Sequence, residues 1–451
     1  MQTSSRAGTI ALYALYSRLF IWAIAVASHA LIQDYDSALE LILPIDTPTQ
    51  RLFKGVFGVF LRWDAFYFTH IAEKGYVFEQ EHAFFPLVPA LMRLMANAAS
   101  KLLPGVLTYQ QLIVISGVLV ANASFILAAV QLYRLSRQLF RDEPFAFLSG
   151  LMYVLTPSGI FSSAIYTEST FAALTFTGML FAAKRQYLLA AVTWSISSTA
   201  RSNGILYAGF FVYDLVVRMD LHRSIVHKAW QIIKAIVLSL ISCTGFAAVQ
   251  AYGYSLYCMN DSSAVAARPW CDKMPPLIYT FVQDYYWYFE VKQIPNFLMA
   301  APMIFLSTMG IVRYVQHDWD RVRTLGRSSR SMLIQGEGTS DGRATHAMAQ
   351  KQSSTRKNRA AAAAAKGPSP FLSDAIFAHV VLWAVLLVTN VTTMHIQIIT
   401  RAFSCMPPVY WYAAHQYRDG KATVQTMATT VFFVLYSLVG IILYANFFPP
   451  A

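Results

Sequence analysis

The sequence predicts an all-α polytopic membrane protein, and three observations support this fold class. Hydrophobic residues make up 56% of the 451 residues and charged residues only 13%, whereas a soluble domain carries roughly 25% charged residues. Apolar runs of about 20 residues, the length that crosses a bilayer, recur along the chain. The net charge of +12 is gathered in clusters between these runs, as the positive-inside rule expects for cytoplasmic loops. This composition excludes a soluble globular protein, and we expect no nucleic-acid partner.

The first apolar run spans residues 9–32 and follows Arg6. It is too long for a cleaved signal peptide and lacks a small-residue cleavage pattern. We therefore predict a retained signal anchor that carries Arg18 into the membrane and exits on the lumenal side.

The next segment, residues 33–101, mixes aromatic with charged residues. Residues 62–68 read Arg-Trp-Asp-Ala-Phe-Tyr-Phe, and residues 83–86 read Ala-Phe-Phe-Pro. Such a pattern is typical of helices that lie in the membrane interface rather than cross it. We predict that this first loop forms lumenal amphipathic helices.

Further apolar runs follow, and the basic clusters between them fix their orientation. When every basic cluster is placed on the cytoplasmic side, the runs make about nine membrane crossings plus a partial hairpin. We therefore expect a bundle of about 9–11 transmembrane helices. The partial hairpin, residues 186–213, has limbs too short for the roughly 30 Å hydrocarbon core, which places Arg201 at membrane depth. The runs lie at residues 102–133, 144–183, 186–213, 235–260, 293–312, 375–400, 402–417 and 422–451.

A basic tract divides the chain into a transmembrane part, residues 1–312, and a C-terminal group of transmembrane helices, residues 371–451. The tract, residues 313–370, is rich in Ser, Gly, Gln and Ala and shows no apolar periodicity. Its stretch 317–370 carries ten Lys and Arg against four Asp and Glu. We predict a disordered cytoplasmic loop.

Asp64 is the first candidate for catalysis. It follows Trp63 in the lumenal loop, close to the predicted bilayer surface. A carboxylate there could act as a general base that removes a proton from an acceptor hydroxyl. The alternatives are a helix N-cap and an ion pair with Arg62.

Three further ionisable residues lie at or just under the lumenal boundary, where such residues usually face a cavity. Arg201 and Arg401 could bind a phosphate, because arginine binds phosphate bidentately and stays charged. The alternatives are that each snorkels to the interface or pairs with Glu168, at the tip of its hairpin. His395 could join them, or could simply pack between helices.

The predicted lumenal loop near residue 260 carries two further features. Cys258 and Cys271 flank a polar segment and could form a disulfide in an oxidising compartment. Asn260-Asp261-Ser262 matches the N-glycosylation pattern. The sequence shows no paired Cys and His spacing for zinc, so we expect no metal site.

Several motifs resemble, in order, those of the PIG-V family of GPI mannosyltransferases, over about residues 50–410. Each motif alone is modest, but the ordered set is specific. The basic tract resembles nothing in the family. The motifs are Trp63-Asp64, His-Ile-Ala-Glu-Lys-Gly-Tyr at 70–76, Ala-Phe-Phe-Pro at 83–86, Tyr166-Thr167-Glu168-Ser169, Arg201-Ser202-Asn203-Gly204, Arg268-Pro269-Trp270-Cys271, Pro-Asn-Phe-Leu-Met-Ala-Ala-Pro at 295–302 and Met-His-Ile-Gln-Ile-Ile-Thr-Arg at 394–401.

The resemblance implies a GT-C glycosyltransferase of the endoplasmic reticulum membrane, with its catalytic part in residues 1–312 and its active site lumenal. It implies transfer of the second mannose, in α1,6 linkage, from dolichyl phosphate mannose to the GPI precursor lipid. It also implies that Asp64 occupies the position of the base, and that a small accessory membrane subunit could take part.

The chemistry of this reaction suggests roles for the other candidates. Arg401, Arg201 and His395 would bind the donor phosphate, and the leaving monophosphate needs no metal or other cofactor. We also expect Trp63, Glu168 and His82 to position the substrates.

Two alternatives stay open. Another glycosyltransferase that uses a dolichyl phosphate sugar, with a lipid-linked oligosaccharide or a protein as acceptor, shares every physical feature above. A lipid transporter fits less well, because the chain shows no pair of Gly- or Pro-broken helices in corresponding halves.

Overall fold

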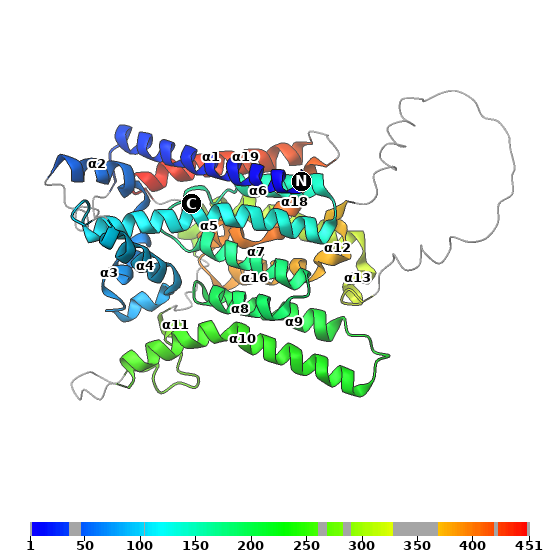
Figure 1. Ribbon diagram of the computed structural model, residues 1–451. Helices are drawn as coiled ribbons and strands as arrows, with labels where there is room; N and C mark the ends of the chain where they lie inside the picture. Colours follow the sequence, from blue (N-terminus) through cyan, green and yellow to red (C-terminus); the bar gives the residue numbers. More distant parts are fainter. Residues whose placement is uncertain are drawn as a thin grey trace, which may run out of the picture.

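The computed structural model describes residues 2–35, 47–102, 104–259, 268–282, 290–327, 369–418 and 423–448. Every regular element within these ranges is a helix (Figure 1). Helices satisfy all their backbone hydrogen bonds within one segment, as a chain in lipid requires. The predicted all-α class is therefore confirmed.

Six helical spans in the described part of the chain are long and apolar enough to cross a bilayer, which makes this a multi-pass membrane protein. In Figure 1 the longest of them run side by side, with α1 and α19 along one edge of the bundle and α10 along the other. The helices of these spans are α1 (Gln2–Leu31), α5 (Tyr109–Phe140), α10 (Ile225–Tyr257), α12 (Ile294–His317), α16 (Phe377–Thr393) and α19 (Val424–Ala445).

Shorter helices fill the space between these spans. The runs at 144–183, 186–213 and 402–417, predicted as crossings or limbs of hairpins, fold as shorter pieces separated by loops. At 1.5 Å per residue, a piece of 12 residues is only about 18 Å long. The pieces are α6 (Glu143–Val154), η4 (Gly159–Ser162), α7 (Glu168–Ala183), α8 (Tyr187–Ser198), η5 (Ser202–Ala208), α9 (Gly209–Val212), the π-helical turn η6 (Tyr213–Val217) and α18 (Pro407–Tyr417).

The predicted amphipathic helices of the first loop are present and gather at one end of the bundle, at the left of Figure 1. α2 begins with a capping box in which Thr47 and Gln50 bind each other's backbone. α3 ends at Gly75, whose φ of 84° favours a residue without Cβ. These elements are α2 (Pro48–Phe57), η2 (Gly58–Phe60), α3 (Ala65–Lys74), η3 (Glu79–Ala83) and α4 (Leu87–Leu102), with α11 (Ile278–Val282) beside them.

A disulfide joins Cys258, just after α10, to Cys271. The segment before Cys271 is fastened to η3, because Glu79 pairs with Arg268 and accepts a hydrogen bond from Nε1 of the buried Trp270 at 3.2 Å. The predicted glycosylation site at Asn260 lies outside the described residues.

At the opposite end, the prediction of disorder from residue 313 is wrong for the first part of the basic tract. α12 continues to His317, and α13 (Trp319–Arg323) follows. The buried Arg321 fixes this turn, since it pairs with Asp318 and Asp374 and donates to the carbonyl of Leu372. Residues 328–368, the remainder of the predicted loop apart from its last two residues, lie outside the described residues.

Candidate active site

A cavity of about 590 Å³ opens between the short helices of the first loop and the bundle. This volume is within the range of small-molecule sites. The first loop supplies a carboxylate and an aromatic wall, and the segments around residues 201 and 395–401 supply basic and amide groups. The lining includes Asp64, Phe68, Phe84, Phe85, Thr167, Arg201, Asn203, Asn390, His395 and Arg401.

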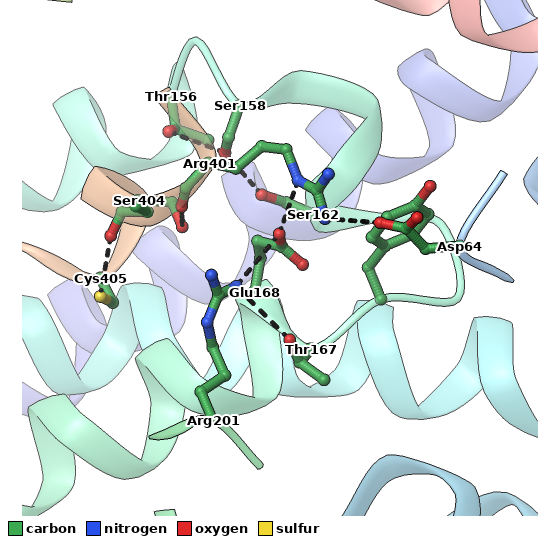
Figure 2. Close-up of polar contacts among 12 residues, drawn as sticks. Asp64, Thr156, Ser158, Ser162, Thr167, Glu168, Arg201, Arg401, Ser404 and Cys405 are labelled. Carbon is green, nitrogen blue, oxygen red and sulfur yellow. Dashed lines mark hydrogen bonds and ion pairs between the residues drawn. The ribbon is translucent and has the colours of Figure 1, made fainter. Parts of the chain in front are cut away.

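Four charged side chains from four distant segments form one network beside this cavity (Figure 2). Arg401 donates from Nε to Oε1 of Glu168 at 2.8 Å and from Nη2 to Oδ2 of Asp64 at 3.3 Å. Arg201 reaches the same Oε1 of Glu168 through Nη1 at 3.1 Å. Figure 2 shows Glu168 lying between the two guanidinium groups. The network therefore connects Asp64, Arg401, Glu168 and Arg201 in that order.

Glu168 is the buried centre of the network. Its side chain is 0% exposed, whereas both arginines remain about one-fifth exposed. Each guanidinium carries five N–H donors, and Glu168 occupies only part of this capacity. The sequence leaves open whether Arg201 and Arg401 pair with Glu168, and in the structure both of them do. This pairing leaves both guanidinium groups at the cavity wall, where an anion can reach them.

Arg401 is held in place by aromatic rings as well as by carboxylates. Its guanidinium lies 4.7 Å from the ring centroids of both Phe161 and Tyr166. It sits on α17 (Ile399–Ala402), directly after the turn η10 (Ile396–Ile398). In that turn Gln397 donates a hydrogen bond to Asn296 at the start of α12. The orientation of Arg401 therefore depends on groups from three separate parts of the chain.

Asp64 occupies the N-cap position of α3, but its side chain makes no capping hydrogen bond. Arg62, its other predicted alternative partner, binds backbone carbonyls and Asp34 instead. The Asp64 side chain is 37% exposed and lines the cavity. Its carboxylate is thus bound on one side by Arg401 and open to the cavity on the other, as a general base requires.

His395 lines the cavity, and its environment determines what it can contribute there. Burial lowers its pKa below the ordinary value, so the imidazole is neutral at neutral pH. It can offer a ring N–H to a bound anion, but it adds no positive charge.

Three residues expected to position substrates lie outside the cavity lining. Glu168 is behind the two arginines. Trp63 packs towards Phe447, with ring centroids 6.3 Å apart. His82 is 1% exposed and stacks on Tyr76 at 4.2 Å, behind the aromatic wall.

Sequence reasoning missed Tyr166 and the pair of Asn296 and Gln397. All three stand inside motifs quoted above, which is the only signal the sequence offers for them. Their roles come from contacts between distant segments, which no local pattern predicts. The described residues also contain no group of three His, Cys, Asp or Glu side chains arranged to hold a metal ion.

The sequence as a whole is similar to known proteins. The family model described as "Mannosyltransferase (PIG-V)" matches residues 6–451. GPI mannosyltransferase 2 of Cryptococcus neoformans is 30% identical, over 92% of this chain and 94% of the relative. GPI mannosyltransferase 2 of Gibberella zeae is 29% identical, over 96% of this chain and 95% of the relative. GPI alpha-1,6-mannosyltransferase 2 of Homo sapiens is 28% identical, over 84% of this chain and 77% of the relative.

Proposed function

This chain belongs to the PIG-V mannosyltransferase family, and on that premise we propose how and where it acts. It is a mannosyltransferase of GPI-anchor biosynthesis, and it acts on a lipid-linked GPI precursor in a membrane. Its donor is dolichyl phosphate mannose, and it adds the second mannose in α1,6 linkage. It resides in the endoplasmic reticulum membrane, with the site on the lumenal side.

The observation that carries this proposal is the contact between Asp64 and Arg401 at the wall of one cavity. Transfer from a sugar phosphate needs a base for the acceptor hydroxyl and a cation for the leaving phosphate. The two groups must act on opposite sides of one anomeric carbon. Asp64 and Arg401 both line the same cavity, which supports this division of roles. Their 3.3 Å contact must open for the anomeric carbon of the donor to lie between them.

In the proposed reaction, a carboxylate oxygen of Asp64 takes the proton from the 6-hydroxyl of the acceptor mannose. The hydroxyl oxygen forms a bond to the anomeric carbon of the donor as the bond from that carbon to the phosphate oxygen breaks. The electron pair leaves with dolichyl phosphate, whose charge Arg401 and Arg201 stabilise. One in-line displacement inverts the β-linked donor into an α product.

The remaining residues support this step. Glu168 keeps the two arginines together through its shared Oε1. His395 offers a ring N–H to the phosphate. Because the leaving group is a monophosphate held by two guanidinium groups, the reaction needs no divalent metal.

Both substrates are lipids, which accounts for the setting of the site. Their tails stay in the bilayer while the sugar and phosphate groups enter the cavity beside the amphipathic helices of the first loop. The exposed apolar face of α10, which includes Trp230 and Leu240, is available to lipid and to the small accessory membrane subunit that we include in this proposal.

A microsomal assay with labelled dolichyl phosphate mannose tests the function. Wild-type membranes should convert the one-mannose GPI precursor to the two-mannose form, and Asp64→Asn membranes should not, at equal protein level. Glu73→Gln is the matched control, because Glu73 lies on the same helix, pairs with Lys74 and does not line the cavity. Normal product from Asp64→Asn would refute the base assignment.

Two further measurements address the rival activity and the proposed side of the membrane. Accumulation of a lipid-linked oligosaccharide, rather than the one-mannose GPI precursor, in a null strain would favour the other glycosyltransferase. In a Trp63→Cys variant, the new thiol should react with a membrane-impermeant thiol reagent only when that reagent has access to the lumen. Labelling from the cytosol in sealed microsomes would overturn the lumenal site.

A further inference from the structure

The residue before the Trp63-Asp64 pair is a completely buried arginine. Arg62 is 0% exposed, and its nearest carboxylate partner, Asp34, is 3.5 Å away. Most of its donors bind backbone carbonyls instead: Ala445 accepts from Nε at 3.2 Å and from Nη2 at 3.0 Å, and Gly58 and Leu61 accept from Nη1. A buried guanidinium is costly unless such bonds are complete. Arg62 therefore joins its own loop to the end of α19.

The carbonyl of Arg62 is held just as firmly. It accepts from the hydroxyls of Tyr166 and Tyr444, each at 3.2 Å, and from the backbone N–H of Ala65 at 3.1 Å. Tyr166 and Tyr444 are both essentially buried. The peptide group between Arg62 and Trp63 is thus fixed from two distant segments, the loop before α7 and the end of α19.

Trp63 has a backbone φ of +54°. For a bulky side chain this left-handed conformation is strained, and it persists only where the surroundings impose it. Here the bonds to Arg62 impose it. The turn at Trp63 directs the chain so that Asp64 begins α3 and its carboxylate lines the cavity.

Phe447, two residues after the end of α19, adds ring contacts to this group. The guanidinium of Arg62 lies 4.3 Å from the centroid of its ring. The same ring stacks on Phe66 at 6.0 Å and lies 6.3 Å from Trp63. We call Tyr444, Ala445 and Phe447 the α19 clamp, because they contact the residues on both sides of Asp64.

We propose that Arg62 and the α19 clamp are positioning residues for mannosyl transfer, which set the orientation of the Asp64 carboxylate towards the acceptor hydroxyl. This inference rests on the proposed role of Asp64 as the base. Arg62 is fully buried, so it acts through Asp64 rather than on the substrate. Catalysis then depends on a part of the chain almost 400 residues away from the base, since the separation of Arg62 and Ala445 is 383 residues.

Tyr444→Phe is the sharpest test, because it removes one hydroxyl oxygen and leaves the aromatic packing in place. A small misplacement of a reacting group can reduce a rate by up to about 100-fold, so we expect kcat to fall about tenfold and the donor KM to change less than about twofold. Tyr314→Phe is the matched control. Tyr314 is also buried and also donates to a carbonyl, that of Ser373, at the other end of the bundle, so kcat should stay at the wild-type value.

Phe447→Leu provides a second variant that removes the ring contacts of Arg62 without touching its hydrogen bonds. It should lower kcat in the same direction, with thermal unfolding of the purified protein confirming that both variants are folded. Wild-type kcat in both Tyr444→Phe and Phe447→Leu would overturn the inference.

A double-mutant comparison separates positioning from general support of the fold. The comparison uses the residual transfer of Asp64→Asn, measured over long incubations with excess enzyme. If Tyr444 acts through Asp64, Tyr444→Phe should cause no further loss of this residual transfer. An additional tenfold loss there would mean that Tyr444 acts by another route. The single variant Asp64→Asn also separates the two proposals. If it is inactive while the clamp variants are normal, the positioning inference fails alone; if it retains wild-type activity, the base assignment itself fails.

Discussion

Arg401 donates its Nε–H to Oε1 of Glu168 at 2.8 Å, across 233 residues of the chain. Glu168 is completely buried, and Arg401 reaches the cavity wall. This ion pair therefore connects the interior of the bundle to the proposed site of phosphate departure. It also makes the arrangement of the site sensitive to substitutions that never contact substrate.

Glu168→Gln should destabilise the protein and lower activity. Removing one partner of a buried ion pair typically costs about 3–5 kcal/mol, because the other charge loses its compensation. Here two arginines lose it together. Thermal unfolding in detergent should show the loss. Asp220→Asn, which breaks an exposed pair with Arg223, should change stability by less than about 1 kcal/mol, and an equal effect of both substitutions would contradict the assigned importance of burial.

Arg401→Gln should raise the donor concentration needed for half-maximal rate and lower kcat/KM by about 10²–10³-fold, the usual effect of losing one group that stabilises developing charge. Arg401→Lys should restore little, because an ammonium cannot bind Glu168 and Asp64 in the same planar geometry. Initial rates at varied donor concentration measure this. Arg51→Gln, on the exposed face of α2, is the control. An unchanged donor dependence in Arg401→Gln would remove this residue from the phosphate site.

His82 should make the folded protein sensitive to mild acid. Burial lowers the pKa of His82 to about 4, whereas an imidazole in an unfolded chain titrates near 6.5. Between these values the unfolded chain binds a proton that the folded protein does not, so stability falls as pH decreases from 6.5 towards 4. His82→Phe keeps the stacking on Tyr76 and should show a smaller fall in unfolding temperature between pH 7 and pH 5.

The control for this measurement is His222→Phe, at an exposed position of the loop before α10. Its unfolding temperature should fall between the two pH values as that of the wild type does. A wild-type acid response in His82→Phe would show that His82 is not the source of the acid sensitivity.

Chelation should leave transfer unchanged. Because we assign the leaving monophosphate to Arg401 and Arg201, we expect activity within about twofold of the untreated value after EDTA treatment and removal of free metal. A loss of turnover that added magnesium or manganese restores would show that a cation shares this role.

Replacing residues 328–366 with a short Gly-Ser linker should leave mannosyl transfer intact. The contacts that fix the start of the basic tract, those of Arg321 with Asp318 and Asp374, remain in such a variant. The same microsomal assay measures the outcome at matched protein level. Loss of turnover would show that this stretch does more than connect two groups of helices.

The sequence predicts the helical class and the residues of the charged network well, for identifiable reasons. The short apolar limbs predict that Arg201 lies at membrane depth, and the alternation of lumenal and cytoplasmic loops predicts Arg401 on the same side of the membrane. The structure brings the two arginines together at one carboxylate. The pairing of both arginines with Glu168 was an open alternative. It is what the structure contains, because a completely buried carboxylate needs cationic partners.

The sequence could not predict which aromatic or polar residues hold this network in place. The buried Arg62 looked like a partner for Asp64, its near neighbour, but binds the end of α19. His82 was expected to contact substrate because it lies in the first lumenal loop beside the Ala-Phe-Phe-Pro motif, yet it packs behind the aromatic wall. In each case the contact that determines where the side chain lies is not visible in the local sequence pattern, because periodicity and spacing carry no information about contacts between separate segments.

The single guanidinium shared by Asp64 and Glu168 has a consequence for the order of events in transfer. Asp64, Glu168, Arg201 and Arg401 are electroneutral as a set. In the proposed reaction, protonation of Asp64 removes one of the two carboxylate charges that pair with Arg401 at the moment the leaving phosphate acquires its full negative charge. The positive charge of the guanidinium is then balanced by the phosphate in place of Asp64, so acceptor activation and leaving-group release are coupled electrostatically through one side chain.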